Sequence, residues 1–200
     1  MTDTLPSTET HPLSPFLPAE ARLLMLGSFP PPRKRWSIDF FYPNLQNDMW
    51  RILGYIFRGD KNCFVDEAAK RFRRDEIIAF AQSTGLALYD TASIVRRLQG
   101  NASDKFLDIV EPTDIAALLR QLPNCRAVAT TGQKATDTLC ERYDTTPPAV
   151  GQSVALSIDG RTLRFYRMPS SSRAYPMKVE RKAEYYRKMF EEIGMLPTRP

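Results

Sequence analysis

The sequence is poor in the residues that build metal and disulfide sites. It has 200 residues with one histidine, His11, and three cysteines, Cys63, Cys125 and Cys140. The cysteines are odd in number and widely spaced, which fits neither a disulfide framework nor a zinc site. An iron–sulfur cluster normally requires a fourth thiolate. We therefore expect no metal and no redox cofactor.

Long hydrophobic runs are also missing. No apolar run approaches the roughly 20 residues that span a bilayer. Residues 1–10 are polar and acidic and lack the apolar core of a secretory signal. The sequence therefore predicts a cytoplasmic protein with no membrane partner.

What remains is the composition of one globular domain with a modest positive charge. Hydrophobic residues make up 42% and charged residues 26% of the chain, as in ordinary α/β domains. Residues 1–20 are rich in Thr, Ser and Pro and are expected to form a flexible N-terminal arm before a single domain over 21–200. The net charge of +5 permits a polyanion partner without proving one. The basic patches at 33–35 and 96–97 either follow phosphates or are merely solvated.

Strand-like and helix-like patterns alternate along the domain. Apolar strands are expected at 22–26, 86–89 and 127–130, with a hairpin over 154–158 and 163–168. Helices are expected at 47–57, 67–72, 75–82, 112–122, 133–142 and 179–193. This alternation predicts an α/β fold, a three-layer α/β/α arrangement around a short, mostly parallel central sheet.

In such a fold the ligand binds at the carboxyl ends of the strands. The segments that directly follow the predicted strands are 27–30, 90–91, 131–132 and 169–173. We therefore expect a site built from these four segments.

Five segments in their order resemble the uracil-DNA glycosylase superfamily, in its hypoxanthine-type branch. They are Leu-Met-Leu-Gly-Ser-Phe-Pro at 24–30, Phe-Phe-Tyr-Pro-Asn-Leu-Gln-Asn-Asp-Met-Trp at 40–50, Gly-Leu-Ala-Leu-Tyr-Asp at 85–90, Ala-Thr-Thr-Gly-Gln-Lys-Ala at 129–135 and Met-Pro-Ser-Ser-Ser-Arg-Ala-Tyr at 168–175. The likeness runs from about residue 11 to residue 190. It implies a monomeric DNA repair enzyme that hydrolyses the N-glycosidic bond of a flipped, deaminated base, uracil or hypoxanthine, without a cofactor.

The resemblance places the base-binding residues in the first loop and at two later positions. A stacked base must be extruded into a pocket before it can be cleaved. Gly27, Ser28 and Phe29 would form the wall of that pocket, and Thr131 would face the edge of the base. Phe29 and Phe41 are the candidates to stack on the base. Phe29 and Phe41 are equally suited to core packing.

The same resemblance assigns the reacting water to Asn47. Better-known branches place Asp or Asn directly after the position of Ser28, but this chain has Phe29 there, which cannot hold a water molecule. In the hypoxanthine-type branch an Asn of the later segment takes over, and the matching residue is Asn47. The alternative is that Asn47 only caps the helix that follows. Both roles can coexist.

The last loop is expected to contact DNA. Ser170, Ser171 and Ser172 offer hydroxyls and backbone amides to phosphates, and Arg173 would fill the gap or contact the strand. The alternative is a plain serine-rich turn.

Two other functions remain open. A catalytically silent relative that binds nucleic acid or senses lesions is suggested by Thr131, where relatives often carry Asn, and by the missing histidine in segment 168–175; His11 is expected to be structural. An enzyme acting on free nucleotides is the third possibility. The single glycine of segment 27–30 argues against it, because phosphate-binding loops are rich in glycine.

Overall fold

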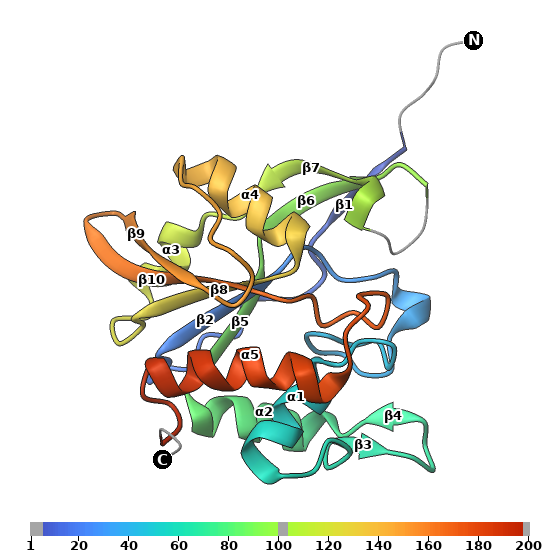
Figure 1. The fold of residues 1–200 in the computed structure, drawn as a ribbon. Coiled ribbons are helices and arrows are strands. Elements are labelled where there is room, and N and C mark those ends of the chain that lie inside the picture. Colours follow the sequence, from blue (N-terminus) through green and yellow to red (C-terminus); the bar gives the residue numbers. More distant parts are fainter. Residues whose placement is uncertain (1–5, 100–103, 198–200) are drawn as a thin grey trace.

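A five-stranded sheet forms the centre of the structure, a computed structural model that describes residues 6–99 and 104–197 (Figure 1). Its strand order is β5 (Leu86–Asp90), β2 (Leu23–Gly27), β8 (Ala127–Thr131), β10 (Arg161–Met168) and β9 (Ser153–Ile158). The first four strands run parallel and only β9 is antiparallel. Every residue of β2, β5 and β8 is buried, as expected of parallel strands covered on both faces. The predicted mostly parallel sheet is confirmed.

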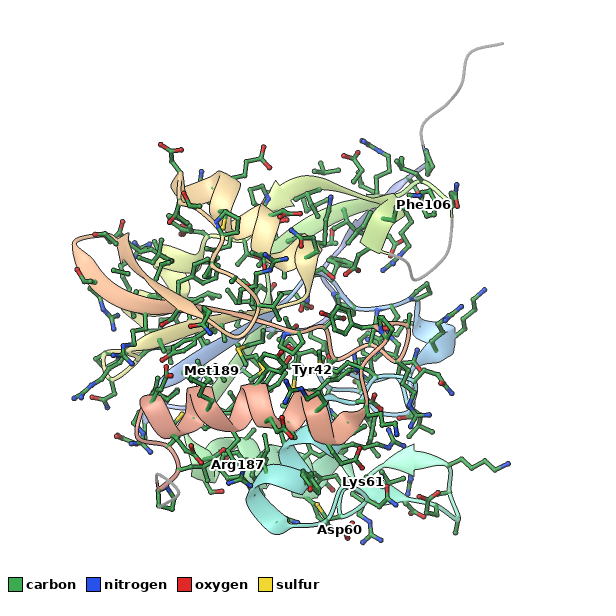
Figure 2. The ribbon with its side chains drawn as sticks, viewed as in Figure 1. Tyr42, Asp60, Lys61, Phe106, Arg187 and Met189 are labelled. Carbon is green, nitrogen blue, oxygen red and sulfur yellow. The ribbon has the colours of Figure 1, made fainter. Side chains whose placement is uncertain are left out.

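Helices cover both faces of this sheet and complete three layers. Figure 1 shows α1 (Met49–Arg58), α2 (Arg74–Thr84) and α5 (Val179–Glu192) on one face, and α3 (Ile115–Arg120) and α4 (Gln133–Tyr143) on the other. Each helix buries apolar side chains that join one core with the strands of the sheet, as amphipathic spacing predicts. In Figure 2, Met189 of α5 points toward the sheet and is fully buried.

A second, antiparallel sheet was not expected from the sequence. It has the order β1 (Thr8–Thr10), β6 (Ala92–Arg97) and β7 (Leu107–Pro112). Part of the expected flexible arm therefore pairs with the domain, and Phe16 further on pairs with Leu88 at the edge of the central sheet. The physical reason is that an uncovered strand edge presents unpaired N–H and C=O groups. Residues 1–5 of the expected arm lie outside the described residues.

The helix expected at 67–72 is wrong. Here β3 (Val65–Asp66) and β4 (Arg71–Phe72) form a short hairpin, and Lys70 takes a left-handed backbone with φ +48°. Only Phe72 of the expected helix is buried, so no apolar face exists to hold a helix against the core. The remaining elements are two single turns, η1 (Arg33–Arg35) and η2 (Asp104–Phe106).

The described part of the chain has no helix long and apolar enough to cross a membrane. Cys63, Cys125 and Cys140 are free thiols.

An aromatic cluster attaches the segment before α1 to the core. The indole of Trp50 is fully buried and stacks on Phe40 at a centroid distance of 6.0 Å. Its Nε1–H donates to the carbonyl oxygen of Phe41 at 3.0 Å. One side chain thus both fills the core and fixes the backbone that leads to the carboxyl ends of the strands.

We expect Trp50→Phe to lower the free energy of unfolding by about 2–4 kcal/mol, because it leaves a void and an unpaired buried carbonyl. Tyr55→Phe, on the exposed side of the same helix, is the matched control and should change stability by less than about 0.5 kcal/mol. Urea unfolding, monitored by circular dichroism so that the signal does not depend on tryptophan fluorescence, gives the free energy of unfolding of both variants. Equal stability of the two variants would contradict the assigned role of the indole.

Candidate functional site

A cavity of about 640 Å³ opens where the carboxyl ends of β2, β5, β8 and β10 meet. Its lining comprises residues 27–31, 35, 41–44, 46–47, 90, 104–105, 131 and 170–174. This volume lies within the roughly 300–1,000 Å³ of small-molecule sites. All residues predicted for the site line it, namely Gly27, Ser28, Phe29, Phe41, Asn47, Thr131, Ser170, Ser171, Ser172 and Arg173. The structure brings the predicted residues together, while their individual roles stay predictions.

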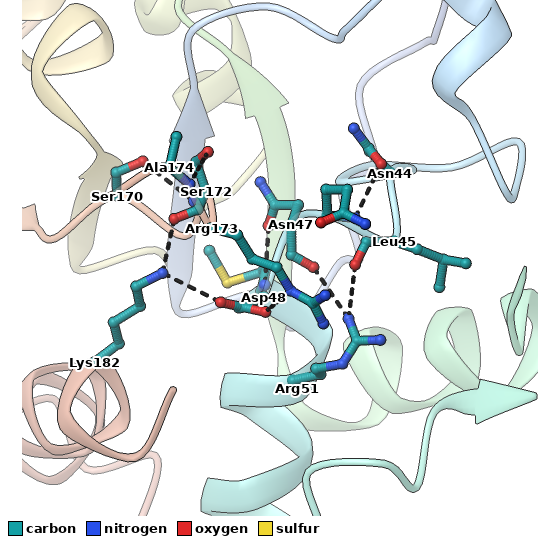
Figure 3. A network of polar contacts seen from close by, with 12 residues as sticks. Asn44, Leu45, Asn47, Asp48, Arg51, Ser170, Ser172, Arg173, Ala174 and Lys182 are labelled. Atoms are coloured by element: carbon teal, nitrogen blue, oxygen red, sulfur yellow. Dashed lines mark hydrogen bonds and ion pairs between the residues drawn. The ribbon is translucent and has the colours of Figure 1, made fainter. Parts of the chain in front are cut away.

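Two loops from distant parts of the chain join at one wall of the cavity. Asn47 and Ser172 form an isolated antiparallel bridge between the loop before α1 and the loop after β10. Next to it, the backbone N–H of Asp48 donates to the carbonyl oxygen of Ser171 at 2.8 Å. The asparagine segment and the serine-rich turn are therefore parts of one wall (Figure 3).

The side chain of Asn47 has a structural partner. Its Oδ1 accepts the backbone N–H of Met49 at 2.9 Å, at the first residue of α1. The N-cap of α1 is Asp48, which makes no side-chain capping bond, so Asn47 accepts the first N–H of the helix from one residue outside the N-cap. Asn47 also lines the cavity, and its role in holding a water molecule stays a prediction.

The backbone comes close to the Asp90 carboxylate where β2 ends, at Gly27. A Cβ placed on Gly27 would lie 2.4 Å from the Oδ1 atom of Asp90, the last residue of neighbouring β5. No real Cβ tolerates that distance, so the Asp90 carboxylate occupies the space that a side chain at 27 would need. Asp90 itself lines the cavity.

Two hydroxyl groups lie beside this carboxylate. The hydroxyls of Tyr42 and Thr131 are 3.3 Å apart, and the Thr131 hydroxyl donates to the carbonyl oxygen of Leu26 at 3.4 Å. Burial raises the pKa of Tyr42, and the charge of Asp90 raises it further. Tyr42 therefore stays a neutral phenol, in a left-handed backbone conformation with φ +50° that non-glycine residues seldom adopt.

His11 supports Asp90 from behind the cavity. Its Nε2 atom lies 2.8 Å from Asp90 Oδ2, and both side chains are buried. The imidazole ring also packs against Tyr89 and, edge-on, against Phe29, at centroid distances of 4.5 and 5.2 Å. The structural role expected for His11 thus extends to a group of the site. Sequence reasoning placed Asp90 among the strand-end residues expected at the site, but it missed the pairing with His11, because nothing in the sequence signals that residues so far apart pair.

The two candidate stacking residues are both part of the core. Phe29 packs in a small cluster with Ala92 and Val95. Phe41 meets Phe40 edge-on at 5.3 Å. Both residues are buried and both line the cavity, so each belongs to the hydrophobic core and to the cavity wall at the same time.

The first loop also has a polar attachment. The hydroxyl of Ser28 donates to Asp104 Oδ1 at 2.9 Å, and both residues line the cavity. This contact joins the loop after β2 to the segment before β7.

The basic residues fall into two groups. Arg97 is buried, pairs with Glu9 and donates to the carbonyl oxygen of Pro30, so the suggestion that it follows phosphates is wrong. Arg96 pairs with Asp108 at 2.8 Å. The turn η1 instead keeps its basic residues outside the core, and its Arg35 lines the cavity.

Within residues 6–99 and 104–197, no three His, Cys, Asp or Glu side chains gather as metal ligands would.

Known proteins match this chain only through structure. No family model matches the sequence, and no curated protein matches it. A solution NMR structure of "a putative Uracil DNA glycosylase from Methanosarcina acetivorans" superposes with a TM-score of 0.62 at 19% identity. The alignment covers 90% of this chain and 96% of the other. The likeness shows that this chain shares the fold of that structure.

Proposed function

We propose that this chain is a monofunctional DNA glycosylase that hydrolyses the N-glycosidic bond of a deaminated base, uracil or hypoxanthine. One observation carries the proposal: Asn47 and the serine-rich turn form one wall of a cavity of about 640 Å³ at the carboxyl ends of the strands. A stacked base is reached only after extrusion, so such an enzyme needs a cavity next to a backbone-binding loop. The fold shared with the archaeal structure supports the same proposal.

The chemistry asks little of the protein. Breaking the bond leaves a cationic sugar and an anionic base. The oxygen of a water molecule then bonds to C1′ of the sugar and a proton of that water neutralises the departing base, so no covalent nucleophile is needed. Asn47 would hold this water through its amide group. Its Oδ1 already accepts one hydrogen bond from Met49, and an amide oxygen has a second lone pair for the water.

The strand ends would grip the base itself. An ionised Asp90 is an acceptor only, and its Oδ2 lies against His11, which leaves Oδ1 for the cavity. Uracil and hypoxanthine each present a ring N–H beside a carbonyl. We propose that Asp90 accepts this N–H, while Gly27, Ser28, Phe29, Phe41 and Thr131 enclose the ring.

The rim would bind the DNA backbone. Ser170, Ser171 and Ser172 supply hydroxyls and amides for phosphates flanking the extruded nucleotide, and Arg173 supplies a charge. Arg35 on the opposite loop adds a second cation at the cavity. The chain would act on DNA as a monomer.

The first test is excision itself. Purified protein is incubated with duplexes that carry one uracil or one hypoxanthine, and abasic sites are then cleaved with alkali. We expect strand scission on at least one of the two substrates and none on an undamaged duplex. Binding without scission on every substrate would instead identify a silent, lesion-binding protein.

The second test addresses Asn47. We expect Asn47→Ala to lower the single-turnover rate on the better substrate at least tenfold, about 1.4 kcal/mol of barrier. Asp114→Ala is the matched control, because Asp114 caps α3 through the N–H of Ala117 at 3.0 Å, outside the cavity lining. Each variant loses one side-chain acceptor for a backbone N–H at the start of a helix, about 1 kcal/mol of stability, but only Asn47→Ala should lose rate. Equal rates of the two variants would exclude Asn47 as the water holder.

The third test addresses Asp90 with methylated bases. Wild-type protein should excise 1-methylhypoxanthine or 3-methyluracil at least tenfold more slowly than the unmethylated base, because the methyl group removes the N–H. Asp90→Ala should lower kcat/KM for the unmethylated base and narrow this ratio toward one. An unchanged ratio in the variant would show that Asp90 does not contact the ring N–H.

A further inference from the structure

A buried charged centre lies behind the wall that Asn47 and the serine-rich turn share. The side chain of Asp48 is 5% exposed and that of Lys182, on α5, is 0% exposed. Lys182 Nζ lies 3.3 Å from Asp48 Oδ2, and Arg173 Nε donates to Asp48 Oδ1 at 2.9 Å. Figure 3 shows the two cations approaching the same carboxylate from different elements.

Lys182 also holds the serine-rich turn. Its ammonium group donates to the carbonyl oxygen of Ser172 at 2.8 Å, in addition to its contact with Asp48. Burial lowers the pKa of Lys182, while the charge of Asp48 opposes this shift. A buried lysine is tolerated only when it is paired and hydrogen-bonded. Here one partner, Ser172, lines the cavity, and the other, Asp48, directly follows the cavity-lining Asn47.

The charges of this centre do not balance. One carboxylate pairs with two cations, and a third cation, Arg51, lies nearby. Burial lowers the pKa of Arg51 and the charge of Arg173 lowers it further, while Asp48 and Glu67 oppose this shift. Arg51 is held elsewhere, by a donation to the carbonyl oxygen of Leu45 at 3.0 Å. The surplus positive charge favours a further anion at this wall.

Arg173 and Lys182 differ in what they can reach. The side chain of Arg173 is 43% exposed and the residue lines the cavity, whereas Lys182 is enclosed. Arg173 can therefore turn toward a phosphate, and Lys182 would then keep the Asp48 carboxylate paired.

We propose that Lys182 is a positioning residue that holds Asp48 and Ser172 together and serves as the permanent counter-ion of Asp48, so that Arg173 is free to exchange Asp48 for a DNA phosphate. This inference rests on the proposed function, since it requires DNA as the ligand. It assigns a role in DNA binding to a side chain that cannot itself touch DNA.

The proposal is testable because a second substitution, at Asp48, should reverse the effect that replacing Lys182 has on DNA binding. Without Lys182, the buried carboxylate of Asp48 has Arg173 as its cation and keeps it from the DNA. If Asp48 is neutralised as well, Arg173 is released again. A purely structural role of Lys182 predicts no such recovery.

The experiment measures binding to a duplex with one tetrahydrofuran abasic site, which a glycosylase cannot cleave, by fluorescence anisotropy across about 50 to 200 mM salt. Each phosphate contact contributes about 0.9 to the slope of log K against log salt. We expect Arg173→Gln and Lys182→Met each to reduce the slope by about 0.9, and Arg173→Gln/Lys182→Met to reduce it no further. Asp48→Asn/Lys182→Met should recover the wild-type slope.

Two further variants provide a control for the test and a replacement for Lys182→Met. Lys188→Met, an exposed lysine of the same helix that lies near Glu192, is the control and should leave the slope unchanged. Lys182→Gln keeps a donor for the Ser172 carbonyl without the charge, and replaces Lys182→Met if that variant does not fold. Circular dichroism verifies the fold of each variant.

The inference is overturned if the slope of Lys182→Met or Lys182→Gln equals that of wild type, or if Asp48→Asn/Lys182→Met does not recover it. These outcomes differ from failure of the proposed function. A protein that excises uracil or hypoxanthine with an unchanged slope in the lysine variants contradicts only the inference, whereas a protein that binds no duplex contradicts both.

Discussion

The pairing of one buried carboxylate with two cations is the constraint on which the site depends. Asp48 directly follows Asn47 in the chain, and its partners Arg173 and Lys182 come from the serine-rich loop and from α5. Isolated buried charges are unfavourable, and a buried ion pair often stabilises a protein no more than an apolar replacement would. We interpret this centre as fixing the geometry of the site. It holds two loops that are far apart in the sequence together in one wall of the cavity.

The carboxyl ends of the strands give the rest of the site its shape. A side chain at position 27 would displace the Asp90 carboxylate, which fills the space beside Gly27 and is held in place by His11. Tyr42 adopts a strained left-handed backbone next to the same group. A strained backbone, a buried carboxylate and a close approach between neighbouring strands therefore occur together, at the edge of the sheet where α/β folds bind their ligands.

The sequence predicted the fold and the composition of the cavity well, for physical reasons. Fully apolar runs such as 23–26 and 127–129 indicate buried parallel strands. The loops that follow parallel strands lie together at one edge of the sheet, so the positions of the strands alone predict which loops meet. The expected helix at 67–72 failed because charged residues there have good helix propensity but no apolar face. The antiparallel sheet with β1 was missed because short, polar edge strands carry little pattern.

The contacts that organise the site could not be read from the sequence. Two pairs join residues that are distant along the chain, Asp90 with His11 and Asp48 with Lys182. No rule of sequence spacing predicts such pairs. Arg97 shows the same limit in reverse, since the sequence suggested it as a phosphate contact but the residue is buried and pairs with Glu9. Local chemistry predicts which residues lie at a strand end, while tertiary packing decides their partners.

The most direct measurement of the central claim is a crystal structure with a duplex that carries a 2′-fluoroarabino analogue of the preferred lesion, which resists cleavage. The account predicts the base outside the helix, in the cavity between Gly27 and Asn47, with the flanking phosphates on the serine-rich turn. A lesion that remains stacked in the duplex, or a duplex bound on a different face of the protein, would contradict it.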